Sequence, residues 1–141
     1  MKRLVFQRKL PARVVLFTVV GGIGFLIDGG VLTLMVKVAH LNPYVGRLVS
    51  FPVAASVTWY LNRRWTFISE VYKRKAPEYI RYMVIQIIGA GINLATYALL
   101  ILFISSLASL PILPLAAGAL IAMVFNFLGL QFFVFRSTAA S

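Results

Sequence analysis

The chain has no cysteine, only three acidic residues and a single histidine among its 141 residues. Without cysteine it cannot form disulfide bonds, thiolate metal sites or a cysteine nucleophile. The histidine, His40, falls between two long apolar segments and is more typical of a polar interfacial residue than of a ligand. No glycine-rich ATP-binding loop is present either. We therefore expect a protein that is not an enzyme and that uses no metal and no cofactor.

Charge is also scarce, because charged residues make up 12% of the chain against 61% hydrophobic residues, with a mean hydropathy of +0.93. A soluble domain of this size needs far more polar surface. Runs of roughly 18–25 apolar residues are long enough to cross a bilayer as helices, and backbone groups in lipid must be satisfied within each helix. The sequence predicts an all-α integral membrane protein with four transmembrane helices, at about residues 14–36, 44–61, 82–104 and 113–135.

The basic start of the chain, followed by an apolar run, has some features of a signal peptide. The run is too long for one and contains Asp28, and no convincing small-residue cleavage site follows it. We expect this segment to be a retained first span.

The net charge of +11 is distributed unevenly. All of the 14 Lys and Arg residues except Lys37 and Arg47 fall before the first span, around the central loop or after the last span. The positive-inside rule therefore predicts that both termini and the central loop are cytoplasmic. This basic face favours anionic lipid headgroups, and we do not expect nucleic-acid binding.

Two halves of the chain resemble each other, since residues 17–28 align without a gap on residues 82–93. Asp28 falls opposite Asn93, and each half ends in an aromatic cluster, at residues 65–67 and 133–135. We expect one membrane domain over residues 1–141, with a first repeat at about 13–67, a basic cytoplasmic loop at 68–81 and a second repeat at about 82–136. With both ends inside, the repeats are parallel, which predicts that the first and third helices face each other and that Asp28 lies near Asn93.

Asp28 is the one acid within a predicted span. A carboxylate at mid-bilayer costs about 3 kcal/mol even on a lenient scale, so it needs a partner or a hydrated cavity. Gly21 and Gly24 share its helical face and predict a close helix contact there. Further polar residues predict a groove for a polar substrate, or alternatively ordinary helix-to-helix hydrogen bonds: Thr58, Asn62, Gln86, Asn93 and Asn126.

Arg47 is the natural counter-ion of Asp28. If their helices are neighbours, an arginine side chain can span much of the difference between the depths of the two residues in the membrane. The alternative is that Arg47 extends to the outer headgroups. Pro52, one turn further along, removes a backbone hydrogen bond and predicts a kink in the second span.

The second span ends in two adjacent arginines, Arg63 and Arg64, flanked by Trp59 and Trp65. Aromatic and basic residues are expected at any cytoplasmic interface. Guanidinium groups also match phosphate oxygens, which suits a phosphate held at headgroup depth. In the second half Gln131 and Phe132 take the place of the arginines, so we expect the two halves to differ chemically.

The chain resembles the GtrA-like family of small four-span membrane proteins from about Arg13 to Arg136. The most specific element is the run Asn62-Arg63-Arg64-Trp65-Thr66-Phe67; the others are the glycine-rich first span up to Asp28, Gly91-Ile92-Asn93 with Tyr97, Asn126-Phe127, and Phe133-Val134-Phe135. The family's second half usually also ends in an arginine-rich signature, and Gln131 and Phe132 depart from it.

The resemblance implies a flippase in the bacterial cytoplasmic membrane that moves a polyprenyl-phosphate-linked sugar to the outer leaflet for surface polysaccharide glycosylation. On this hypothesis Arg63 and Arg64 capture the phosphate, Arg47 receives it near the outer surface, and Asp28 is the one plausible proton carrier. The alternatives are a membrane anchor for a glycosyltransferase and a small multidrug-type exporter; the arginines argue against the exporter. Expected partners are the lipid-linked sugar, membrane lipids, a membrane glycosyltransferase and further copies of the chain.

Overall fold

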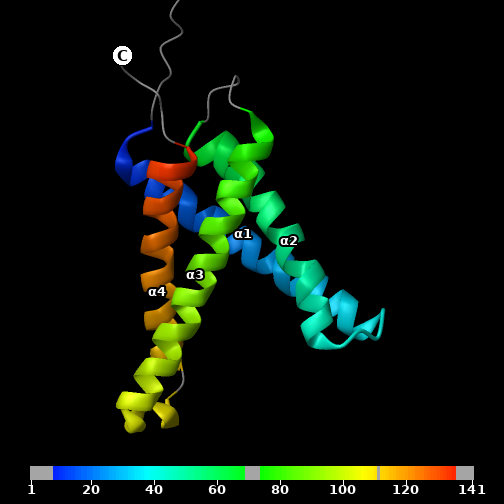
Figure 1. The fold of residues 1–141 in the computed structure, drawn as a ribbon, viewed down its shortest axis with the longest axis vertical. Coiled ribbons are helices and arrows are strands. Elements are labelled where there is room, and N and C mark those ends of the chain that lie inside the picture. Colours follow the sequence, from blue (N-terminus) through cyan, green and yellow to red (C-terminus); the bar gives the residue numbers. More distant parts are fainter. Residues whose placement is uncertain (1–7, 69–73, 111, 136–141) are drawn as a thin grey trace, which may run out of the picture. The chain divides into compact units, whose positions relative to one another are not determined.

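The computed structural model describes residues 8–68, 74–110 and 112–135, and in these ranges every regular element is a helix. The all-α prediction is therefore confirmed. The chain divides into two compact units, the first of Met1–Lys75 together with Ala139–Ser141 and the second of Ala76–Thr138 (Figure 1). Lys2, Arg3, Lys73 and Arg136, which contribute to the predicted basic face, lie outside the described residues.

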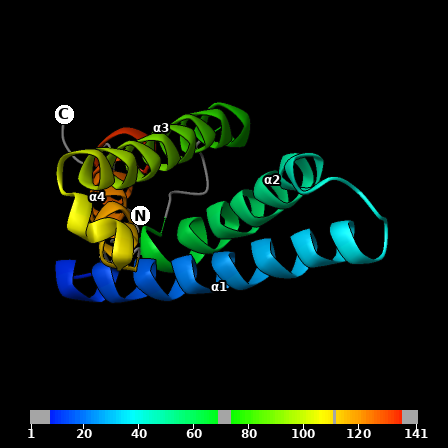
Figure 2. The same ribbon diagram turned by 90° about the horizontal axis from the view of Figure 1, so that it is seen from below.

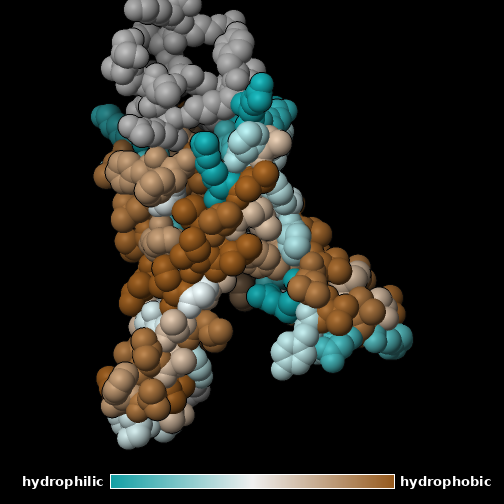
Figure 3. Space-filling model, in the orientation of Figure 1, coloured by the Kyte–Doolittle hydropathy of each residue, from teal (hydrophilic) through white to brown (hydrophobic). Residues whose placement is uncertain are grey.

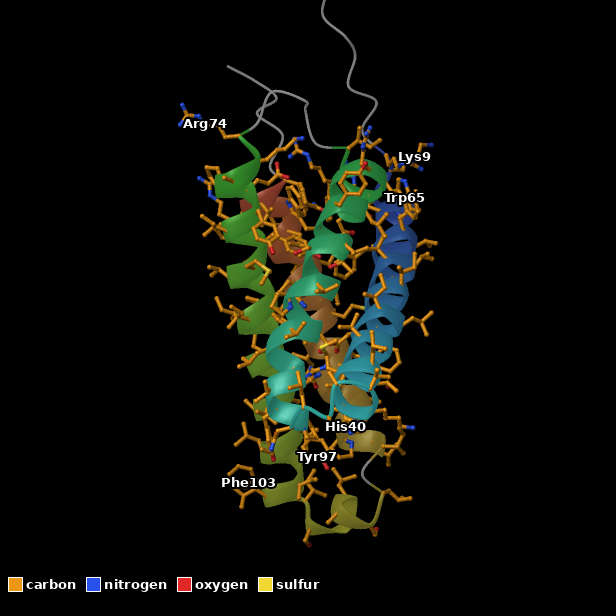
Figure 4. All side chains as sticks on the ribbon, turned by 90° about the vertical axis from the view of Figure 1, so that its right-hand side faces the viewer. Lys9, His40, Trp65, Arg74, Tyr97 and Phe103 are labelled. Atoms are coloured by element: carbon orange, nitrogen blue, oxygen red, sulfur yellow. The ribbon has the colours of Figure 1, made fainter. Side chains whose placement is uncertain are left out.

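The first unit is a helical hairpin of α1 (Leu10–Lys37) and α2 (Pro43–Leu61), which continues into a π-helical turn, η1 (Asn62–Thr66). The sequence marks the hairpin: α2 starts with Pro43 at its first position, and the Asn42 side chain accepts a hydrogen bond from the Tyr44 N–H at 2.8 Å. α1 and α2 lie side by side (Figure 2). Lys9 and Trp65 mark one end of this hairpin and His40 the other (Figure 4).

The second unit repeats this plan with α3 (Lys75–Phe103), a short 3-10 turn η2 (Ser105–Ser109), α4 (Ile112–Gly129) and a second π-helical turn, η3 (Leu130–Val134). α3 begins before the apolar window at Tyr82 because Pro77 and Glu78 suit the first turn of a helix. Residues 75–81, which the sequence placed in the basic loop, are thus helical, whereas residues 69–73 lie outside the described part.

Three helical segments are long and apolar enough to cross a membrane: α1, α3, and α4 together with η3. The fourth helix, α2, matches the second predicted span in its bounds but is less apolar, because Arg47 and several hydroxyl residues interrupt it. Hydrophobic colour covers most of the visible face of α3, and hydrophilic colour gathers towards the helix ends and partway along the α1–α2 hairpin (Figure 3). The chain is a multi-pass membrane protein.

The internal repeat extends to details that the sequence alone did not reveal. The register that aligns residue 17 with residue 82 also aligns the first residues of α1 and α3, Leu10 and Lys75. A second register, set by the aromatic clusters, aligns η1 with η3 residue by residue. Equivalent positions are buried in both units, as in the pairs Phe17/Tyr82, Gly24/Gly89, Ala54/Ala122, Asn62/Leu130 and Thr66/Val134. The two units therefore share the plan of one helical hairpin, with equivalent positions buried.

Candidate functional site

An ion pair joins the two helices of the first unit partway along their length. Arg47, in the second turn of α2, donates from Nη1 to Oδ2 of Asp28 on α1. The Asp28 side chain is 19% exposed and the Arg47 side chain 51% exposed, so the carboxylate is the more buried partner. Of the two interpretations of Arg47 that the sequence left open, pairing with Asp28 is confirmed.

The second carboxylate oxygen of Asp28, Oδ1, is buried and has no hydrogen-bond partner. The same is true of the hydroxyl of Ser50, a fully buried residue of α2. Ser50 lies three residues after Arg47, a spacing that places both on one face of the helix. Sequence reasoning missed Ser50, although its position one turn from Arg47 was a usable signal.

Small residues allow α1 and α2 to pack closely against each other. Gly24 lies against the methyl group of Thr58, and a Cβ at Gly46 would be 2.9 Å from Cδ1 of Leu32. The Thr58 hydroxyl donates to the Ala55 carbonyl of its own helix at 3.1 Å. Gly21 was expected to share the contact face, but nothing lies within 4 Å of a Cβ placed there. The predicted contact in the first unit is therefore made by Gly24 and not by Gly21.

The π-helical turn η1 holds a buried polar pair at the end of α2. The Thr66 hydroxyl donates to Oδ1 of Asn62 at 2.8 Å, and both residues are fully buried. The Phe67 N–H bonds back to the Asn62 carbonyl at 2.9 Å, the five-residue step of a π-helix. Turns of this type are rare and often occur at functional sites. Thr66 was not among the predicted site residues, and its spacing of four from Asn62 was the available signal.

The two arginines inside η1 have different environments. Arg63 is buried, at 8% exposure, and its guanidinium lies 6.0 Å from the centre of the Trp59 ring. Arg64 is exposed and lies 5.7 Å from the centre of the Tyr60 ring. Both distances are within reach of a cation–π interaction, and guanidinium groups match the geometry of phosphate oxygens.

The arginine turn and the Asp28–Arg47 pair are separate places in the first unit. Sixteen residues of mostly α-helical chain separate Arg47 from Arg63, or roughly 24 Å at 1.5 Å per residue. No single phosphate can contact both, so these arginines form two sites. The turn lies at the Lys9 and Trp65 end of the hairpin (Figure 4).

In the second unit the predicted amides pack reciprocally between α3 and α4. Asn126 of α4 lies against Gly89, and Asn93 of α3 lies against Gly118. Oδ1 of Asn126 is buried without a hydrogen-bond partner. Gln86 lies on α3 and is half-buried. The expected proximity of Asp28 to Asn93 concerns two different units and stays a prediction.

The second unit keeps the π-helical turn but lacks both the buried Asn–Thr pair and the two arginines. Leu130 and Val134 replace the Asn62–Thr66 pair and are likewise buried. Gln131 stands where the first unit has Arg63, and its Oε1 is buried without a partner. The predicted chemical difference between the halves therefore also appears in the folded chain, with the arginine pair confined to one unit.

The model of one protein family, described as the GtrA/DPMS transmembrane domain, matches residues 16–135. The match covers both hairpins, the Asp28–Arg47 pair and the two π-helical turns. The chain thus belongs to the GtrA/DPMS transmembrane-domain family, whose members are associated with the handling of polyprenyl-phosphate-linked sugars.

Proposed function

We propose that this protein is a flippase that moves a polyprenyl-phosphate-linked sugar from the cytoplasmic to the outer leaflet of the bacterial cytoplasmic membrane. The observation that carries the proposal is Arg63, which is buried in a π-helical turn with its guanidinium 6.0 Å from the centre of the Trp59 ring. The fork of N–H donors on a guanidinium matches the oxygens of a phosphate, and a neighbouring aromatic ring suits a site at headgroup depth. Since the chain belongs to a family associated with polyprenyl-phosphate sugars, the phosphate of such a lipid is the proposed anion.

Two separate arginine sites favour a protein that moves a lipid phosphate across the membrane over one that only anchors a glycosyltransferase. Arg63 and Arg64 capture the phosphate at the cytoplasmic surface, and Arg47, about 24 Å away along the helix, receives it nearer the outer surface. A phosphate that crosses the hydrocarbon core of the bilayer needs such a second cation, because an unpaired charge there is energetically costly. The polar groups proposed to contact the sugar hydroxyls are Asp28, Thr58 and Asn62 in the first unit and Gln86, Asn93 and Asn126 in the second. The reaction is translocation, with no covalent change in the lipid.

A transport assay tests the capture site. Purified protein is reconstituted into liposomes, and entry of a short-chain isoprenyl phosphodiester of radiolabelled glucose is followed with time. Replacing both arginines with alanine (R63A/R64A) should lower the initial rate at least about 10-fold, since charge-assisted hydrogen bonds contribute about 1.5–3 kcal/mol each.

The matched control is K9A/R74A, which removes two exposed basic residues without touching η1. This variant should transport at close to the wild-type rate. Equal rates for R63A/R64A and the wild type would refute the capture role. No transport by folded wild-type protein would refute the flippase and favour an anchor for a glycosyltransferase.

A further inference from the structure

We infer that Gln131 recognises the sugar of the transported lipid, with its amide oxygen accepting a hydrogen bond from a sugar hydroxyl. The acceptor role rests on the geometry of the second unit. The assignment of that hydroxyl to a lipid-linked sugar rests on the proposed function. The inference gives a ligand to the residue at which this chain departs from the arginine-rich signature usual in its family.

The starting observation is a buried acceptor without a partner. Within the described part of the chain, Oε1 of Gln131 is buried and accepts no hydrogen bond. Buried amide oxygens are normally paired, and one left unpaired costs free energy that a ligand with a donor group recovers. Gln131 as a whole is only half-buried. Its side chain has several rotatable bonds, so a change of rotamer can turn the oxygen towards a ligand.

Gln131 occupies the place in its turn that Arg63 occupies in the first unit. The register that aligns η1 with η3 places Gln131 on Arg63 and Phe127 on Trp59. Both turns are π-helical, a type that is rare and often occurs at functional sites. The same backbone arrangement therefore presents an arginine in one unit and a glutamine in the other.

The change from arginine to glutamine changes the class of ligand. A guanidinium has only donors, which suit the oxygens of a phosphate, whereas an amide is neutral and its oxygen is an acceptor. The unpaired atom of Gln131 is that oxygen, so its ligand must carry a donor. A phosphodiester and an isoprenyl chain have no N–H or O–H group. In a polyprenyl-phosphate-linked sugar, the donors are therefore the sugar hydroxyls.

The charges of the second unit favour a neutral donor over a cation. Its described part has two charged residues, Glu78 and Arg81, whose charges are opposite in sign. From Tyr82 to Phe135 the sequence has no charged residue and no histidine. An ammonium group or a metal ion at Gln131 would lack a net counter-charge, and a metal ion would also need more oxygen ligands. A hydroxyl group needs one acceptor and no counter-charge.

Two matched ligands isolate the contribution of the sugar. One is a short-chain isoprenyl phosphodiester of glucose, and the other has the same chain and phosphate with a methyl group in place of glucose. Their affinities are measured by isothermal titration calorimetry in lauryldimethylamine oxide, a detergent without hydroxyl or phosphate groups. The ratio of the two affinities is the measured quantity. The wild type should prefer the glucose ligand by at least about 2-fold, the effect of one net hydrogen bond.

Variants of Gln131 separate an acceptor from a packing role. Q131L keeps a side chain of similar size without polar atoms, so it should lower the ratio by about 2- to 10-fold and leave binding of the methyl ligand unchanged. Q131E keeps an acceptor oxygen and loses the N–H donors, so it should keep the wild-type ratio even where its charge weakens both ligands.

Two further variants serve as controls. R63A should weaken both ligands by the same factor, because the ligands share the phosphate, and the ratio should not change. S109A removes an exposed hydroxyl of the second unit that donates to the Ser106 carbonyl, and it should bind both ligands as the wild type does.

The glycerol headgroup of phosphatidylglycerol is a second source of hydroxyl groups in a membrane. Short-chain phosphatidylglycerol and phosphatidylmethanol share a phosphodiester and differ in these hydroxyls, so the same titrations are made with this pair. Q131L should leave the ratio of their affinities unchanged. A preference for phosphatidylglycerol that Q131L removes, with the glucose ratio unaffected, would assign the hydroxyl to a membrane lipid and overturn sugar recognition.

An unchanged glucose ratio in Q131L, or a ratio in Q131E as low as that in Q131L, would overturn the acceptor role. Equal wild-type affinities for the glucose and methyl ligands would overturn sugar recognition and leave phosphate capture standing. Failure of the wild type to bind either ligand would overturn both proposals. A ratio that falls in Q131L, in a protein that does not transport the lipid, would support sugar recognition and remove the flippase.

Discussion

The contact between Asn93 and Gly118 gives the sharpest stability prediction. A Cβ added at Gly118 would lie 2.7 Å from the backbone oxygen of Asn93. A backbone oxygen cannot rotate away as a side chain can, so α3 and α4 must move apart locally. Overpacking of this kind costs about 1–3 kcal/mol. We therefore expect G118A to lower the free energy of unfolding by about that amount.

A second glycine in the same unit provides the control. A Cβ at Gly91 meets nothing within 4 Å, and alanine is favoured over glycine inside a helix by about 1 kcal/mol. G91A should therefore be neutral or mildly stabilising. Because the gain in helix propensity applies to both glycines, the two variants should differ by the overpacking cost alone, about 1–3 kcal/mol. Unfolding by sodium dodecyl sulfate in mixed micelles, followed by far-UV circular dichroism, measures the difference. Equal stability of G118A and G91A would refute the register of α3 against α4.

Three further predictions concern the first unit, where both tryptophans of the chain lie, so that their fluorescence can report its unfolding. T66V should cost about 1–3 kcal/mol because it removes the donor to the buried Asn62 amide, whereas N62L/T66V should cost less, since the second unit holds an apolar pair in the equivalent turn. R47A should destabilise more than D28N, by about 1 kcal/mol, because it leaves a mostly buried carboxylate unpaired while D28N leaves a half-exposed guanidinium. H40G should raise stability by about 0.5–1 kcal/mol, because exposed His40 has a φ of 54°, a left-handed conformation that glycine adopts without strain. The T66V account would be contradicted if N62L/T66V lost more free energy of unfolding than T66V. The ion-pair account would be contradicted if D28N lost more than R47A, and the His40 account if H40G were less stable than the wild type.

Much of the fold was predictable because long apolar runs in lipid leave few alternatives to a helix. The bounds of α1 and α2 agree closely with their apolar windows, and the likeness of residues 17–28 to residues 82–93 predicted the repeat. α3 begins at Lys75, before the predicted span at 82–104, because hydropathy ignores Pro77 and Glu78, which begin a helix without being apolar. The π-helical turns could not be predicted, since no residue pattern distinguishes a five-residue backbone step from a four-residue one before the chain has packed.

For the site, sequence reasoning found the charged residues and missed the buried hydroxyl groups of Ser50 and Thr66. The cost of burying Asp28 pointed to a counter-ion, and Arg47 was within reach. Serine and threonine are common in membrane helices, so Ser50 and Thr66 do not stand out in the sequence. They matter because they are fully buried, and burial cannot be read from a single sequence. Gly21 failed as a contact residue because a shared helical face spans a wide arc, of which α2 covers only the part at Gly24.

The central claim is that the protein carries a lipid-linked sugar across a bilayer. The most direct measurement is entry of the labelled isoprenyl phosphodiester of glucose into liposomes that contain purified wild-type protein, compared with protein-free liposomes and with D28N. We expect label to enter liposomes with wild-type protein faster than it enters protein-free liposomes, and D28N to slow that entry. Entry no faster than into protein-free liposomes, with folded protein present, would contradict it.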